Sequence, residues 1–109
     1  MLICDSHIHW YERMWPLGTN GTIDEASIVN KDTYKTNAGK SMTHIINGMA
    51  GNIESHSTLP ANETLNITNI LDQEHYGFSR LTVLNSTALK WEFVQGDGPI
   101  GDTFTLIKG

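Results

Sequence analysis

The strongest constraint on the fold is an alternation of apolar and polar side chains in the last thirty residues. Segments 79–85 and 88–94 both alternate with a period of two, which is typical of β-strands with one buried face. Turn-forming residues at 85–87 and 96–101 separate these segments from each other and from the final apolar stretch. We therefore expect an antiparallel meander over residues 79–107.

The patterns upstream of this meander are weaker. Residues 42–47 have the composition of another strand, and residues 22–25 fit a capping box that would begin a short helix or a single turn. Residues 55–77 resemble a long loop, within which residues 64–71 fit strand and helix spacing equally. Helical content is expected to be low, so the predicted class is α+β and mostly β.

Charge and composition exclude several functional classes. The 109 residues fit one small domain. Seven basic residues face twelve acidic ones, and the formal charge of −5 disfavours a nucleic-acid partner. A membrane span is not expected, because no apolar run reaches roughly 18 residues. Cys4 is the single cysteine, which excludes an internal disulfide and a zinc finger; we interpret it as a small buried apolar residue.

Four triplets of the form Asn-x-Thr could accept an N-linked glycan, at Asn20, Asn62, Asn66 and Asn85. The sequence has nine asparagines, and serine or threonine occupies 19 of its 109 positions, so chance alone would give roughly 1.6 such triplets. The excess indicates a secreted glycoprotein. The first residues show no basic region followed by an apolar core, so no signal peptide is predicted, and we expect that the beginning of the protein is missing.

The segment from Asp5 to Arg13 carries the chemistry. It contains two histidines, His7 and His9, separated by one residue. On an extended segment the two imidazoles would point to the same face, with Cα atoms about 6–7 Å apart. Imidazole binds zinc, iron and manganese, so the pair does not specify the ion. A complete site needs three or four more ligands, and a pair of this kind in isolation is more often two surface or core histidines than a metal site.

Two metal-dependent families share features of this segment. Asp5-x-His7-x-His9 resembles the first-strand motif of the amidohydrolases, whose sites lie inside a barrel of roughly 250 residues that this chain cannot form. Residues 7–13, HIHWYER, resemble the final metal motif, G-H-x-H-x-Y-E-R, of plant and fungal purple acid phosphatases. Residues 43–56 and 75–94 are similar to the strands that follow this motif, so the second resemblance covers nearly the whole chain in the correct order.

The second resemblance implies an α/β/β/α sandwich that holds ferric iron beside zinc, manganese or ferrous iron and hydrolyses phosphate monoesters at acid pH. It also implies that His7 binds the divalent ion and His9 binds iron. Tyr11, Glu12 and Arg13 complete the motif, and we interpret them as support for the histidine segment rather than as catalysts.

The sequence departs from the family pattern in two ways. Ser6 stands where the family has glycine, and the upstream aspartates, tyrosine, asparagine and histidine of the metal centre are absent. We therefore expect one partial domain over 1–109, with a metal-motif segment at 1–15 and a C-terminal region at 42–109. This chain should neither hold both metals nor be active without the remainder of the phosphatase domain.

Two alternatives from other classes remain open. One is a non-catalytic β-rich module with a binding or structural role. The other is an amidohydrolase-like remnant, which an antiparallel arrangement of residues 79–107 would exclude.

Simpler roles are expected for other notable side chains. Trp10, Trp15 and Trp91 are interpreted as core residues. Asp97 and Asp102 are interpreted as turn formers, because both lie next to glycines.

Overall fold

The computed structural model describes residues 2–5, 8–50 and 66–109. Strands dominate this part of the chain, which contains a single 3₁₀ turn, η1 (Glu25–Ser27), and no α-helix. The strands are β1 (Leu2–Asp5), β2 (Tyr11–Met14), β3 (Leu17–Gly18), β4 (Ile28–Asn30), β5 (Thr33–Lys35), β6 (Ser41–Asn47), β7 (Thr68–Asp72), β8 (Gly77–Asn85), β9 (Ala88–Gln95) and β10 (Ile100–Ile107). The prediction of a mostly-β protein is confirmed.

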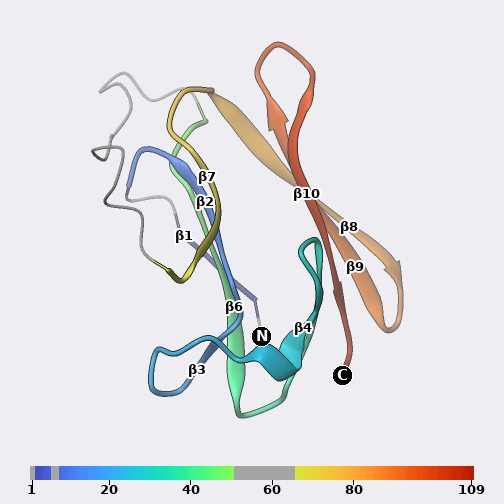
Figure 1. Ribbon diagram of the computed structural model, residues 1–109. Helices are drawn as coiled ribbons and strands as arrows, with labels where there is room; N and C mark the ends of the chain where they lie inside the picture. The colour runs from blue at the N-terminus through green and yellow to red at the C-terminus, as the bar shows by residue number, and fades with distance from the viewer. Residues whose placement is uncertain (1, 6–7, 51–65) are drawn as a thin grey trace.

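The strands form two sheets (Figure 1). The first is mixed and has the order β1-β6-β2-β7. Strand β3 pairs with the first residues of β6. Strand β6 pairs in parallel with β1 and antiparallel with β2. The predicted strand at residues 42–47 is therefore central to this sheet.

The second sheet has the order β4-β5-β10-β9-β8. Strands β8, β9 and β10 pair antiparallel with short connections between them, which confirms the predicted meander. Strand β5 joins the other side of β10 in parallel. An amidohydrolase-like remnant is excluded, because such a barrel needs parallel strands alternating with helices.

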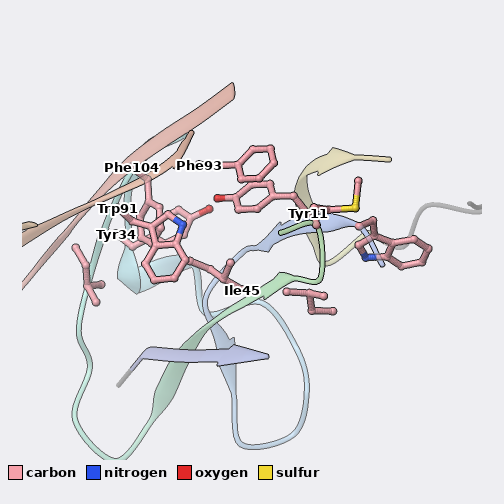
Figure 2. Close-up of a cluster of buried hydrophobic side chains, with 10 residues drawn as sticks. Tyr11, Tyr34, Ile45, Trp91, Phe93 and Phe104 are labelled. Carbon is pink, nitrogen blue, oxygen red and sulfur yellow. The ribbon is translucent and has the colours of Figure 1, made fainter. Parts of the chain in front are cut away.

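The two sheets enclose one apolar core, whose centre is drawn in Figure 2. In β10 the buried residues Phe104 and Leu106 follow the period-two alternation, because successive side chains in a strand point to opposite faces, whereas residues 91–94 of β9 are all buried. Of the three tryptophans, Trp10 and Trp91 are buried and Trp15 packs half-buried against the cluster, as predicted. The buried apolar members are Trp10, Tyr11, Tyr34, Ile45, Ile46, Met49, Trp91, Phe93, Phe104 and Leu106.

The local predictions have mixed outcomes. The capping box does not form, since the Thr22 hydroxyl donates to Asn20, but the expected single turn is present as the 3₁₀ turn that begins after Asp24. Residues 64–71 fit strand and helix spacing equally, and the structure has a strand, because β7 begins at Thr68 and pairs with β2; the loop expected over 55–77 is therefore wrong at residues 68–72. The prediction for Cys4 is wrong, because this residue is exposed rather than buried.

The residues that the structure describes include no helix that is both long and apolar enough to cross a membrane.

Candidate functional site

The histidine motif leads into a bend rather than continuing as a strand. After β1 the backbone bends at residues 8–10, where the Trp10 amide donates to the Ile8 carbonyl at 3.0 Å. The Gly48 amide, at the end of β6, donates to the Trp10 carbonyl at 3.1 Å. His9 is half-buried within this bend. The extended conformation that we expected is therefore wrong at His9, and His7 lies outside the described residues.

Several strands of the first sheet end at the edge where this bend lies. The bend follows the carboxyl end of β1, and β6 ends at the same edge because it runs parallel to β1. Strand β7 also ends here, with Asp72 opposite Tyr11. The Asp72 carboxylate pairs with Nδ1 of His75 at 2.9 Å, and this contact raises the pKa of His75. The ends of β1, β6 and β7 thus lie at the edge of the sheet where the bend of the motif lies.

Arg13 connects the first sheet to the second through an ion pair with Asp102. Its side chain is fully buried, and its Nε and Nη2 atoms each lie 2.9 Å from a carboxylate oxygen of Asp102. Nη2 also contacts Asp32 at 2.9 Å, and the guanidinium carbon lies 5.0 Å from the centre of the Phe104 ring. Nη2 donates a hydrogen bond to Asp102, whereas the close contact of Nε with this carboxylate is an ion pair without hydrogen-bond geometry. The ion pair therefore connects β2 to β10 across the two sheets.

Tyr11 reinforces the same contact. Its hydroxyl donates to Asp102 at 2.8 Å, and its ring stacks on Phe93 with a centroid distance of 4.3 Å. Figure 2 shows the Tyr11 ring lying flat against Phe93, with its oxygen directed towards the side of the cluster that holds Trp91 and Tyr34. Burial raises the pKa of Tyr11, and the negative charge of Asp102 raises it further. The phenol therefore stays protonated and remains a donor.

The charge of Arg13 is secure despite its burial. Burial by itself would lower the pKa of Arg13, but the negative charge of Asp102 and the hydrogen bond to Asp32 contribute to a net increase. A buried charge of this kind is tolerated only when it is paired and hydrogen-bonded. The carboxylates of Asp102 and Asp32 therefore both stabilise the charged form of Arg13.

Glu12 points to the opposite face of β2 and connects the bend to β7. Its buried carboxylate accepts a hydrogen bond from Trp10 Nε1 at 3.1 Å and another from the Thr68 hydroxyl. Tyr11, Glu12 and Arg13 each make at least one contact that spans many residues of sequence.

Asp102 was missed as a site residue by sequence reasoning. It is not a turn former, because it lies within β10 beside a register irregularity. The sequence nevertheless contained a signal for its role. Asp102 is two residues before Phe104 and four before Leu106, so all three lie on the same, inward face of the strand. A carboxylate on the apolar face of a strand needs a buried partner, which the sequence does not identify.

The described residues do not form a metal site by themselves. Among residues 2–5, 8–50 and 66–109, no group of three or more His, Cys, Asp or Glu side chains could hold a metal ion. His9 is the one predicted ligand within these ranges. The described residues therefore do not fit a metal centre without further ligands.

The predicted glycan acceptors lie at the surface where they are described. Asn20, Asn66 and Asn85 are exposed, and Asn62 lies outside the described residues.

Comparisons with known proteins identify the family of this sequence. Residues 41–103 match the family described as iron/zinc purple acid phosphatase-like protein C. Since the match covers more than half of the chain, the chain belongs to this family. No solved structure matches.

The individual relatives are much longer proteins. The chain is 65% identical over 104 residues to an acid phosphatase from Aspergillus ficuum, an alignment that covers 94% of this chain and 17% of the relative. It is 34% identical over 110 residues to acid phosphatase type 7 of Danio rerio, covering 94% of the chain and 22% of the relative. It is 32% identical over 101 residues to a nucleotide pyrophosphatase/phosphodiesterase of Hordeum vulgare, covering 92% and 25%. The chain thus spans a quarter or less of each relative.

Proposed function

We propose that this chain is the C-terminal part of a secreted acid phosphatase that hydrolyses phosphate monoesters at a dinuclear metal centre. The observation that carries the proposal is the 65% identity to the Aspergillus ficuum acid phosphatase over 94% of the chain. The centre would contain ferric iron and a divalent zinc, manganese or iron ion. The remainder of the phosphatase domain would supply the other ligands.

Within this assignment the chain divides into two parts. Residues 1–15 would present His7 and His9 as ligands, and residues 42–109 would form the scaffold beneath them. Tyr11, Glu12 and Arg13 would act as positioning residues, since their hydrogen bonds and ion pairs connect the motif to β7 and β10. Such contacts orient metal ligands without touching the substrate.

Secretion is proposed from the four Asn-x-Thr triplets, of which the described three have exposed asparagines. Nucleic acid is not proposed as a partner, because the formal charge of −5 repels phosphate backbones. The proposed substrate is a phosphate monoester, and a membrane partner is not proposed.

The proposal is tested by transplanting this chain into its relative. The matching segment of the Aspergillus ficuum acid phosphatase is replaced by residues 1–109, and turnover of p-nitrophenyl phosphate and bound iron are measured. We expect the chimera to be active, and His9→Ala to abolish both activity and full metal occupancy. The matched control is His75→Ala, which removes an exposed histidine outside the motif. A folded, metal-loaded chimera without activity would refute the proposal.

The isolated chain gives a second test. After loading with ferric iron and zinc, the 109-residue polypeptide should not hydrolyse p-nitrophenyl phosphate, because two histidines cannot hold two metal ions. Measurable turnover that disappears in His9→Ala would contradict this part of the proposal.

The non-catalytic β module remains the second candidate. It is favoured by the apolar core that both sheets share. A cooperative melting transition of the isolated chain that is unchanged by iron or zinc, together with an inactive chimera, would support it.

A further inference from the structure

Trp10 closes a tight turn that has His9 at its centre. The Trp10 amide donates to the Ile8 carbonyl at 3.0 Å, and a hydrogen bond from residue i+2 back to residue i defines a γ-turn. The backbone angles of His9 are therefore those of the turn, and they determine the direction in which its imidazole leaves the chain. The motif G-H-x-H-x-Y-E-R leaves the position of Trp10 unspecified, so the resemblance assigns this residue no role.

Trp10 is held at two further points besides its amide. Its carbonyl accepts a hydrogen bond from the Gly48 amide at 3.1 Å, and its indole Nε1 donates to Glu12 Oε1 at 3.1 Å. Trp10 is only 9% exposed, so a donor or acceptor that lost its partner here would be costly to leave unpaired. A different conformation of the turn would break at least one of these three hydrogen bonds.

The donor to the Trp10 carbonyl is itself fixed. The next residue, Met49, is fully buried, and its carbonyl accepts a hydrogen bond from the Gly77 amide at 2.7 Å. The Met49 amide donates to the side-chain oxygen of Asn47 at 3.2 Å. The chain that follows β6 is therefore anchored to the beginning of β8, and Gly48 presents its N–H to Trp10 from this anchored segment.

The acceptor of the indole N–H is equally constrained. Glu12 is buried in the first sheet, where it pairs with Ile46 of β6 and Leu71 of β7. Its second carboxylate oxygen, Oε2, accepts a hydrogen bond from the Thr68 hydroxyl. Each oxygen thus has its own donor, and the carboxylate cannot rotate without losing one of them. The position of the Trp10 indole is therefore determined by the sheet.

The other motif residues act away from the turn. Tyr11 and Arg13 bind Asp102 of β10, so they attach β2 to the second sheet. Glu12 points to the opposite face of β2, because successive side chains of a strand alternate between faces. Trp10 adjoins His9 and binds Glu12, so it connects the sheet directly to the turn.

We propose that Trp10 is a positioning residue, whose indole N–H bond to Glu12 holds the turn at residues 8–10 and sets the direction of the His9 imidazole. Trp10 acts through His9 and is not itself a catalytic residue. The inference rests on the proposed function only where it concerns the use of His9 as a ligand.

The direction of the His9 ring is measured first without metal. In the 109-residue chain labelled with ¹³C and ¹⁵N, three-bond couplings of His9 report the angle χ1. We expect a single rotamer in the wild type and averaged couplings in Trp10→Phe, which keeps an aromatic ring but removes the N–H. The control is Trp15→Phe, the same substitution at a half-buried tryptophan whose ring centre lies 6.0 Å from that of Tyr34. It should leave the His9 couplings unchanged.

Two variants of Glu12 separate the hydrogen bond from the charge of the carboxylate. Glu12→Gln keeps an oxygen that accepts the indole N–H and gains an amide that donates to the Thr68 hydroxyl, so its His9 couplings should lie close to those of the wild type. Glu12→Leu removes the acceptor and should reproduce the effect of Trp10→Phe. Combining Glu12→Leu with Trp10→Phe should add little, because both substitutions remove the same interaction.

The chimera with the Aspergillus ficuum acid phosphatase tests the consequence, and it carries the test if a variant of the isolated chain does not fold. Trp10→Phe should lower kcat for p-nitrophenyl phosphate about 10-fold or more with little change in KM, and it should accelerate the loss of iron to EDTA. Trp15→Phe should change neither property. Melting temperatures measured in parallel separate positioning from stability, since Trp15→Phe should lower the melting temperature without accelerating iron loss.

The outcomes distinguish this inference from the proposed function. An inactive wild-type chimera would count against the proposed function, and the His9 couplings would still decide the inference. In an active chimera, a Trp10→Phe variant that retains both kcat and iron would overturn the inference alone. Unchanged His9 couplings in Trp10→Phe would overturn it as well.

Discussion

Asp102 binds the buried guanidinium of Arg13 through both of its carboxylate oxygens, although 89 residues separate the two in sequence. Arg13 belongs to β2 of the first sheet and Asp102 to β10 of the second. The segment that carries the histidine motif is thus attached to the C-terminal meander by a directed ion pair. The same carboxylate accepts the Tyr11 hydroxyl, so one side chain fixes two residues of β2.

Removal of the Asp102 charge should be strongly destabilising. In Asp102→Asn the fully buried Arg13 keeps only the exposed Asp32 as an anionic partner, and breaking a buried ion pair by removing one charge costs about 3 kcal/mol or more. Urea denaturation of the variant should show this decrease in the free energy of unfolding. The control is Asp97→Asn in the exposed 96–99 turn, which should change stability by less than about 0.5 kcal/mol. A loss below about 1 kcal/mol in Asp102→Asn would contradict the assigned role of the pair.

The hydroxyl and the ring of Tyr11 should contribute separately. Tyr11→Phe removes the hydrogen bond to Asp102 but retains the stack on Phe93, so a loss of about 1.5–3 kcal/mol is expected for a bond to a charged group. Tyr11→Leu also removes the stack and should cost more. Equal losses in the two variants, measured by thermal or urea unfolding, would show that the hydrogen bond has no separate effect.

Thr68 should stabilise the protein through its hydroxyl. In Thr68→Val the shape is retained, but the buried Glu12 carboxylate loses a donor, which costs about 1–3 kcal/mol. Thr68→Ser keeps the donor and should lie closer to the wild type. Calorimetric melting of the two variants makes the comparison, and a Thr68→Val protein as stable as Thr68→Ser would exclude this role for the hydroxyl.

His75 should titrate above its ordinary pKa of 6.5, because its ring pairs with Asp72. The raised pKa means that the protonated ring is favoured in the folded state. Its stabilising effect is therefore complete below pH 6.5 and is lost as the pH rises through the folded pKa. NMR titration of the His75 ring protons should show a midpoint that falls in Asp72→Asn. A midpoint unaffected by that substitution would contradict the pairing.

Gly77 should not tolerate a side chain. A Cβ atom at this position would collide with the Val94 carbonyl oxygen and lie 2.8 Å from the Phe93 ring. Gly77→Ala should therefore destabilise the protein by about 1–3 kcal/mol through overpacking. At Gly96 a Cβ atom would meet its nearest neighbour, the Tyr76 carbonyl oxygen, at 3.5 Å, so Gly96→Ala serves as the control. Similar urea midpoints for both variants would contradict the close approach.

The sequence by itself determined the meander, because alternation along a strand and the composition of short turns depend on neighbouring residues. It also indicated the family, since HIHWYER is a contiguous motif followed by similar strands in the correct order. The tertiary structure alone decided the bend at His9, the pairing of β7 with β2, and the partner of Arg13. These features depend on how the two sheets pack, and a buried charge selects its partner by distance in space. From the sequence, Asp102 was only a carboxylate near glycines. The packing of the two sheets shows that it forms the ion pair with Arg13 of the motif.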